Sequence, residues 1–413
     1  MKKLAMKKIL IKNFPNVNNY GTAMMGLITI QSLIKNYGIE NIEIYCCFNE
    51  YAVKEEVYRE LEGVIELKNY TNREFDSESK VKNLFLKKVF ILWNMFFNNE
   101  KKMFDKIIVL GGDDFSEYYS KYFASVQLYK LWRLSKHTEI VMLGQTIGPF
   151  VSVINRFTFK KLLPKLDVYA RDPWTVQYFQ KEFNLNIKLM GDLAFNPLPL
   201  QSDLALESSI LKEYKLDKNS YSTVVISGLF ESGYYCESEE LYLLRHQEVI
   251  QELLEVNTLL DKKVVLLAHT FPPFGDESSL VMKLFNKFSE KEKERIVVVI
   301  EKILPTKARF ILGNGLFSIT GRMHPAVSTF QMGKPSIMLS YSAKYHGVIG
   351  KGLNRSDLII DANNSDLWVS GEIVSLVKDR VTYVLHNYSK LASEIILDVD
   401  RLRVVNSEVL KKL

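Results

Sequence analysis

Short runs of β-branched and apolar residues alternate with amphipathic stretches of about 10–18 residues along most of this chain, and this rhythm restricts the possible folds more than any other feature. Strands that alternate with helices form βαβ units, in which the strands run parallel. We predict strands at residues 7–13, 42–48, 64–69, 106–111, 139–144, 167–171 and 187–191, and again at 222–228, 263–268, 296–300, 316–320, 335–340 and 357–360. A helix is predicted at 21–37, and helical stretches at 366–388 and 390–411 end the sequence.

A break in this rhythm predicts two domains. Pro197 and Pro199, followed by polar residues, interrupt the alternation, so residues 196–220 are predicted to form a linker. The length of 413 residues also exceeds that of a usual single domain. The expected fold class is therefore α/β, with two doubly wound domains at 1–195 and 221–365 that face each other across a cleft. The helices of 366–413 are expected to pack back on the first domain.

Composition excludes several classes of protein. A hydrophobic fraction of 47% and a charged fraction of 25% indicate a folded globular chain. The net charge of +6 suits ordinary lysine-rich solubility, which we favour, or else an anionic ligand or a membrane surface; it is too diffuse to indicate nucleic acid. The three cysteines (Cys46, Cys47, Cys236) have neither disulfide-framework nor metal-ligand spacing, which predicts a reducing compartment and no metal site. With no signal-peptide pattern and no apolar run of spanning length, the expected location is the cytoplasm.

The segment 80–102 combines lysine-rich ends with an aromatic centre. This pattern suits contact with an anionic membrane surface, which would place the protein at the inner face of the membrane. It also suits a buried crossover helix between the third and fourth strands, which we favour, and the sequence leaves both interpretations open.

Ligands of such sheets lie beyond the carboxyl ends of the strands, so the strand-to-helix turns are the places to look for chemistry. The first turn carries Asn19 before a helix, which indicates either a hydroxyl or anion site or a plain helix cap. A later turn has the sequence Gly111-Gly112-Asp113-Asp114. Its two glycines would let a ligand approach the backbone, and two carboxylates follow them directly. These carboxylates are predicted to act as a general base on a hydroxyl, or else to cap the next helix.

Two further strand ends offer hydrogen-bonding groups. Gln145 and Thr146 follow one strand, and Arg171-Asp172-Pro173 follows the next. An arginine at a strand end can hold a carboxylate or phosphate through two parallel hydrogen bonds. The alternative is an Arg–Asp pair that only stabilises the turn.

The strongest candidate turn is Gly321-Arg322-Met323-His324-Pro325, where a helix is predicted to open at Pro325. Arg322 is a permanent cation and His324 is of a type that titrates near neutral pH. Both are expected beside the helix N-terminus, which is electropositive. The next strand end carries Tyr341 and Lys344, and His269 ends another strand nearby in the predicted sheet. Together these groups predict a pocket for an anion.

These turns, taken in order, resemble the polysaccharide pyruvyl transferase family. The matching segments span residues 12–350 and are Gly111-Gly112-Asp113, Gly144 to Pro149, Arg171-Asp172, Gly191 to Phe195, Leu267-Ala268-His269, Arg322-Met323-His324, Gly333-Lys334-Pro335 and Tyr341 to Lys344. The resemblance implies two Rossmann-like domains arranged as in B-type glycosyltransferases. It also implies transfer of a pyruvyl group from phosphoenolpyruvate to two hydroxyls of a sugar, which forms a ketal on a surface polysaccharide or its lipid-linked precursor.

The residues suit that chemistry. Phosphoenolpyruvate carries a carboxylate and a phosphate, which Arg171, Arg322 and Lys344 would bind, and no other cofactor is implied. His324 would protonate the enol carbon, and Asp113 or Asp114 would orient or deprotonate the acceptor hydroxyl.

One turn departs from the family pattern. The family often has Asn-x-Gly-Asp in the first turn, whereas this chain has Asn19-Tyr20-Gly21-Thr22. This departure leaves open a non-catalytic sugar-binding subunit of an envelope-assembly complex. The expected architecture also leaves open a B-type glycosyltransferase that uses a nucleotide sugar, since a fold does not determine a function.

Overall fold

A computed structural model describes residues 6–14, 18–46, 57, 59–70, 103–117, 123–232, 234–236, 238–256, 261–272 and 275–413. The chain forms two compact units. Unit 1 comprises residues 1–16, 25–193 and 408–413, and unit 2 comprises residues 17–24 and 194–407. The predicted basic and aromatic segment 80–102 lies outside the described residues.

Unit 1 contains a parallel sheet whose described strands follow the order β3-β2-β1-β4-β5-β6-β7. The strands are β1 (Lys7–Lys12), β2 (Ile42–Cys46), β3 (Leu67–Asn69), β4 (Lys106–Leu110), β5 (Glu139–Gln145), β6 (Asp167–Ala170) and β7 (Lys188–Leu189). Each coincides with a predicted strand. The order reverses between β1 and β4, and such a reversal opens a crevice at the carboxyl ends of the strands.

Unit 2 repeats this topology. Its described strands are also parallel, in the order β10-β9-β8-β11-β12-β13, with the reversal between β8 and β11. They are β8 (Tyr221–Val225), β9 (Lys263–Leu267), β10 (Ile296–Val299), β11 (Ser318–Thr320), β12 (Ser336–Ser340) and β13 (Ile359–Asp361). The α/β class with two Rossmann-like domains is therefore confirmed.

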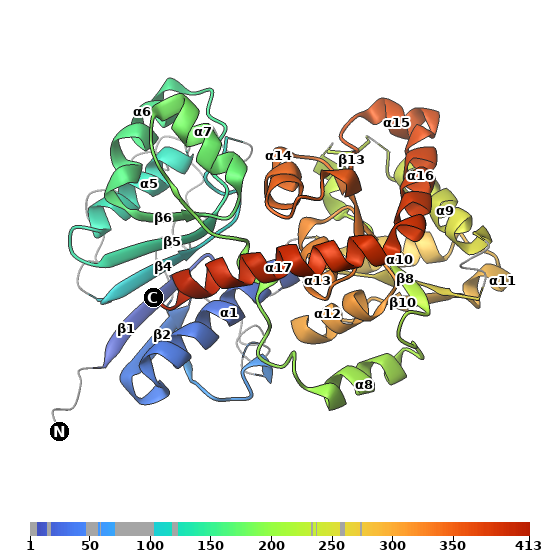
Figure 1. Cartoon of the computed structure of the whole chain (residues 1–413), viewed down its shortest axis with the longest axis horizontal. Coiled ribbons are helices and arrows are strands. Elements are labelled where there is room, and N and C mark those ends of the chain that lie inside the picture. Colours follow the sequence, from blue (N-terminus) through green and yellow to red (C-terminus); the bar gives the residue numbers. More distant parts are fainter. Residues whose placement is uncertain are drawn as a thin grey trace, which may run out of the picture. The chain divides into compact units, whose positions relative to one another are not determined.

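Helices connect the strands and cover the sheets. The described α-helices are α1 (Tyr20–Tyr37), α5 (Phe123–Leu134), α6 (Val153–Leu162), α7 (Pro173–Phe183), α8 (Leu204–Glu213), α9 (Glu239–Glu255), α10 (Glu277–Phe285), α11 (Glu290–Lys293), α12 (Pro305–Asn314), α13 (Met323–Gln331), α14 (Ala343–Tyr345), α15 (Ser365–Ser370), α16 (Glu372–His386) and α17 (Tyr388–Leu410). Figure 1 shows α5, α6 and α7 gathered beside β4, β5 and β6. Phe159 of α6 and Phe179 of α7 pack there against Met142 of β5 in one buried cluster.

Two local predictions need correction. The segment 196–220, predicted to be a linker, contains helix α8, whose first turn is capped because the Asp203 carboxylate accepts a hydrogen bond from the Leu206 N–H at 2.9 Å. The stretch 366–388, predicted as one helix, is divided into α15 and α16 at Gly371, which has a φ of +81°. A positive φ cannot continue a right-handed helix, and glycine adopts it without steric cost.

Two short segments of the chain belong to the unit that is farther away in sequence. Residues 17–24 group with unit 2, where the Phe271 N–H donates to the Asn18 carbonyl at 2.8 Å. Residues 408–413 group with unit 1, where the Asn36 amide donates to the Leu410 carbonyl at 2.7 Å and the Tyr37 hydroxyl donates to the Leu413 carbonyl. The predicted return of the C-terminal helices to the first domain is confirmed for these last residues.

Candidate functional site

The carboxyl ends of the unit 2 strands bring together most of the titratable residues predicted from the sequence. We call this group the strand-tip cluster, and it consists of His269, Glu277, Arg322, His324, Tyr341 and Lys344. They follow β9, which lies on one side of the reversal, and β11 and β12, which lie on the other. In the described ranges of the chain, no group of three or more His, Cys, Asp or Glu side chains is placed to hold a metal ion.

A buried carboxylate holds three strand ends of the cluster in place. Glu277, the first residue of α10, is 0% exposed, and its Oε1 accepts hydrogen bonds from Arg322 Nε at 2.6 Å and from the Gly228 N–H at 3.3 Å. Its Oε2 accepts from the N–H groups of His269 and Thr270, both at 3.0 Å. One side chain therefore connects the ends of β8, β9 and β11.

The ion pair also sets the charge of Arg322. Burial by itself would lower the pKa of this guanidinium, but the Glu277 carboxylate raises it, and the net shift is upward. Nε donates its hydrogen bond to Glu277. Gly275 lies beside the other end of the guanidinium, since a Cβ at this position would be 3.7 Å from Nη2. Arg322 thus remains a permanent cation whose Nε is occupied by the protein.

His324 lies at the N-terminus of α13, where the partial positive charge of the helix gathers. The helix begins at Met323 and not at Pro325 as predicted; Pro325 is the third helical residue, where a missing N–H costs no intrahelical bond. The backbone of Gly21, in the first turn of α1, packs directly on the His324 side chain, because a Cβ at that position would lie only 2.8 Å from the His324 Cβ. The Asn19 side chain accepts a hydrogen bond from the Gly21 N–H at 3.0 Å. Asn19 thus fixes the turn that contacts His324.

His269 is 1% exposed and lies against the ring of Tyr20, with ring centroids 5.1 Å apart. Burial, followed by the charges of His324 and Arg322, lowers the pKa of His269 well below its ordinary value, so the imidazole is neutral at pH 7. Its Nε2 and the neighbouring Thr270 hydroxyl are buried and have no hydrogen-bond partner among the described residues. Buried polar atoms of this kind are expected where a ligand completes the hydrogen bonds.

Tyrosines support the other side of the cluster. The hydroxyls of Tyr235 and Tyr345 both donate to the carbonyl of Gly321, at 2.5 and 2.8 Å, and so anchor the residue before Arg322. Tyr341 accepts a hydrogen bond from Lys344 Nζ at 2.6 Å, and this ammonium also lies 4.7 Å from the Tyr341 ring centroid. Tyr341 and Lys344 are both partly exposed to solvent.

Arg171 belongs to unit 1, whereas Arg322 and Lys344 belong to unit 2. Arg171 is 3% exposed, and its Nη1 bonds to Asp192 at 2.9 Å while its Nε donates to the Thr146 hydroxyl at 2.9 Å. The Thr146 hydroxyl donates to Asp172 at 2.8 Å. This geometry favours the alternative in which Arg171 stabilises the turn, although the ion partner is Asp192 and not the adjacent Asp172.

Asp172 instead caps helix α7. Its carboxylate accepts a hydrogen bond from the Thr175 N–H at 2.7 Å, and burial raises its pKa. Pro173 is the first residue of α7, a position where its fixed φ suits the helix and its missing N–H is not needed.

The glycine and carboxylate turn of unit 1 lies beside β5. A Cβ at Gly111 would overlap the backbone of Gly144, so this position accepts only glycine. Gln145 is 0% exposed, and its amide donates to the carbonyls of Val109 and Leu143 at 3.0 and 3.2 Å, while its Oε1 is buried with no hydrogen-bond partner among the described residues.

The two carboxylates of that turn differ in exposure. Asp113 is half-buried and Asp114 is exposed, with the Asn13 amide donating to Asp114 at 3.3 Å. Neither caps a helix among the described residues. Gly112, which precedes this pair, is also partly exposed. The two carboxylates that are predicted to act on the acceptor hydroxyl are therefore within reach of solvent.

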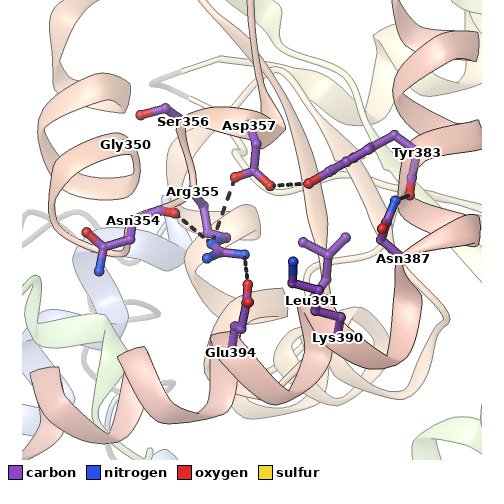
Figure 2. A pocket seen from close by; sticks show the side chains of 10 residues that line it. All are labelled: Gly350, Asn354, Arg355, Ser356, Asp357, Tyr383, Asn387, Lys390, Leu391 and Glu394. Carbon is purple, nitrogen blue, oxygen red and sulfur yellow. Dashed lines mark hydrogen bonds and ion pairs between the residues drawn. The ribbon is translucent and has the colours of Figure 1, made fainter.

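A separate cavity of about 480 Å³ lies in unit 2 between the segment 350–357 and helices α16 and α17. Figure 2 shows Arg355 at its centre, with contacts to Asp357 and Glu394 at 3.8 and 2.8 Å. Tyr383 donates to Asp357 at 2.9 Å. Arg355 and Asp357 precede β13, so the cavity lies toward the amino ends of the strands, and its opposite charges pair with one another.

Sequence reasoning missed Glu277 and the contact between Gly21 and His324. Glu277 follows Asp276 at the start of a helix, a position where an acidic residue is common and carries no special signal. Its one distinguishing feature is that it lies eight residues after His269, in the turn that follows β9.

Comparison with known proteins identifies the chain's relatives. The family model described as polysaccharide pyruvyl transferase matches residues 19–343. The amylovoran biosynthesis protein AmsJ of Erwinia amylovora is 21% identical over 325 residues, which cover 76% of this chain and 73% of that protein.

Solved structures share the fold. The UDP-GlcNAc 2-epimerase of Neisseria meningitidis bound to UDP-GlcNAc has a TM-score of 0.59 at 11% identity and covers 97% of both chains. A co-structure of S. aureus MnaA with UDP has a TM-score of 0.55 at 13% identity and covers 97% of this chain and 92% of that one. At such low identity these likenesses show the fold alone, which is that of two Rossmann-like domains of the glycosyltransferase B class.

Proposed function

Because this chain belongs to the polysaccharide pyruvyl transferase family, we propose that it transfers the pyruvyl group of phosphoenolpyruvate to two hydroxyls of a sugar in a surface polysaccharide or its precursor, forming a ketal. The observation that carries this proposal is the strand-tip cluster, in which a permanent cation, Arg322, and a histidine, His324, open the same helix. No cofactor is needed, since the donor carries both the activated carbon and the leaving group. We expect the reaction to take place in the cytoplasm, where phosphoenolpyruvate would be available.

Phosphoenolpyruvate is held by positive groups in this proposal. Its carboxylate and phosphate need several positive groups, and the cluster offers the Arg322 guanidinium, the Lys344 ammonium and the electropositive N-terminus of α13. His269 is neutral and would donate or accept one further hydrogen bond through Nε2. Glu277 keeps Arg322 oriented through its bond to Nε.

The reaction begins with a proton transfer. The His324 imidazolium gives a proton to the terminal CH₂ carbon of the enol, and the π electrons of the double bond form the new C–H bond. The central carbon becomes an oxocarbenium-like centre, stabilised by the phosphate-ester oxygen. A sugar hydroxyl adds to this carbon and loses its proton to a base, for which Asp113 or Asp114 is the candidate.

The second half of the reaction closes the ring. The bond between the central carbon and the phosphate-ester oxygen breaks, and inorganic phosphate leaves with the bonding electrons. The second hydroxyl adds to the resulting oxocarbenium centre and loses its proton. Of the two hydroxyl protons, one replaces the proton delivered by His324 and the other goes to phosphate, so phosphoenolpyruvate and a diol give a ketal and phosphate.

The donor assignment is tested by phosphate release from phosphoenolpyruvate in the presence of a panel of synthetic and lipid-linked glycosides. We expect acceptor-dependent release that falls at least about 10²-fold in His324→Ala, the usual contribution of a positioned acid. His386→Ala is the matched control because His386 is exposed on α16, and this variant should retain wild-type turnover.

Other outcomes would contradict the proposal. Wild-type turnover in His324→Ala would remove His324 as the acid. A rise in melting temperature with UDP-GlcNAc but not with phosphoenolpyruvate, together with no phosphate release, would favour a nucleotide-sugar glycosyltransferase.

A further inference from the structure

Helix α6 of unit 1 exposes apolar side chains to solvent. The exposed fraction is 87% for Val151, just before the helix, and 79%, 55% and 64% for Val153, Ile154 and Phe157. Single exposed apolar residues are common, but four within seven positions form a contiguous patch. This patch is separate from the strand-tip cluster, which belongs to unit 2.

The patch lies on one face of a firmly packed helix. The spacing of Val153, Ile154 and Phe157 places them on the same side of α6, and the exposed Lys160 and Lys161 follow one turn later on that side. The opposite face is buried through Phe159, whose ring lies 4.3 Å from that of Phe150.

The start of the helix is also fixed. The Glu117 carboxylate accepts hydrogen bonds from the N–H groups of Val151 and Ser152, both at 2.9 Å, and from the Asn155 amide at 2.7 Å. The apolar residues are therefore presented by an ordered helix end and not by a frayed one.

The charged residues of the segment that carries the patch are all basic. Between residues 151 and 166 the sequence contains Arg156, Lys160, Lys161 and Lys165 but no acidic residue. Of these cations, Arg156 is paired with Glu182 at 3.0 Å, while Lys160 and Lys161 are exposed beside the apolar face. An apolar stripe with adjacent lysines is the pattern of helices that lie in the interface of an anionic membrane.

We propose that α6 docks unit 1 on an anionic lipid surface, with Val153, Ile154 and Phe157 inserted among the headgroups and Lys160 and Lys161 facing lipid phosphates. Charge complementarity selects lipid over a second copy of the chain, since two copies of the same basic face repel one another.

This docking has a consequence for the reaction. The loop 146–152 joins the end of β5 to α6, and the Thr146 N–H donates to the Gly112 carbonyl at 2.9 Å. The patch is thus connected to the edge of the sheet that carries Asp113 and Asp114. If the proposed function holds, a lipid-linked acceptor would reach these carboxylates from the membrane; the docking itself does not depend on that function.

The test is co-sedimentation of the full chain with vesicles of phosphatidylcholine alone and of an equal mixture of phosphatidylcholine and phosphatidylglycerol. We expect binding to the anionic vesicles that weakens as salt is added, because screening reduces the attraction. The double variant Ile154→Ser/Phe157→Ser should lower the partition constant at least about tenfold, since each buried CH₂ contributes about 0.8 kcal/mol. Lys160→Glu/Lys161→Glu should lower it by a similar factor.

The matched control is Leu204→Ser. Leu204 is 75% exposed on α8 of unit 2, and its replacement should leave vesicle binding unchanged. Melting temperatures of all variants should match that of the wild type, since the altered side chains are exposed.

Equal binding of the wild type and Ile154→Ser/Phe157→Ser would overturn the proposal, as would equal binding to neutral and anionic vesicles. Concentration-dependent dimerisation that this double variant abolishes, without vesicle binding, would assign the face to a second copy instead.

Discussion

Replacing Gly21 by alanine should disable the strand-tip cluster although none of its members is substituted. The new methyl would lie 2.8 Å from the His324 Cβ and still closer to the ring atoms Cγ and Nδ1. Rotation of the imidazole cannot relieve the contact with Cβ, so the start of α13 must move by about 1 Å. A misplacement of that size costs about 10²-fold in rate. Overpacking costs about 1–3 kcal/mol of stability, which the better helix propensity of alanine offsets by at most about 1 kcal/mol.

The assay combines acceptor-dependent phosphate release with urea unfolding of four proteins: the wild type, Gly21→Ala, His324→Gly and the double variant. With glycine at position 324 the three contacting atoms are absent, so Gly21→Ala should then cost no stability. The coupling energy of this cycle should be about 1–3 kcal/mol. If Gly21→Ala destabilised the wild type and His324→Gly equally, the contact with His324 would not be the cause of the lost stability. Wild-type turnover of Gly21→Ala would likewise refute the expected effect of this contact on catalysis.

Two further predictions concern buried charges. Glu277→Gln keeps only one of the two oxygens that accept backbone hydrogen bonds and leaves Arg322 buried without a counter-charge. We therefore expect a loss of about 3–5 kcal/mol in urea unfolding, against less than about 1 kcal/mol for Glu394→Gln at the partly exposed pair with Arg355. Burial lowers the pKa of His246 from 6.5 to about 4, so the unfolded chain binds a proton first as the pH falls, and stability should drop between those values by up to roughly 3 kcal/mol. His246→Phe should remove this part of the pH dependence of the unfolding free energy, and an unchanged slope would contradict it.

The strands were predictable because their signal is local. Runs such as Ile107 to Leu110 and Val264 to Leu267 are β-branched and apolar and lie between amphipathic stretches, which is typical of strands buried on both faces. Helix α8 was missed because Pro197 and Pro199 signal a break, although Asp203 caps the helix that follows. The two prolines indicate the end of regular structure more strongly than the single capping residue indicates the start of a helix.

The candidate site was predictable only in part. Arg322 and His324 follow a recognisable strand, so the topology places them at the strand end. The roles of Arg171 and Glu277 depend on partners distant in sequence, Asp192 and Arg322, which residue type cannot reveal. A buried arginine with an internal carboxylate and an arginine that binds a substrate look the same in sequence.

The exchange of chain segments between the two units has a consequence for biosynthesis. The main part of unit 1, up to Leu193, is synthesised before most of unit 2. Residues 408–413, which contact Tyr37 and Asn36, are synthesised only after all of unit 2. Unit 2 in turn needs residues 17–24, which were synthesised long before it. Neither unit can reach its final packing during translation as domains usually do, one after the other. Both should become resistant to protease together, only after residues 408–413 have left the ribosome, and a gene fragment encoding only residues 194–407 would lack Gly21 beside His324.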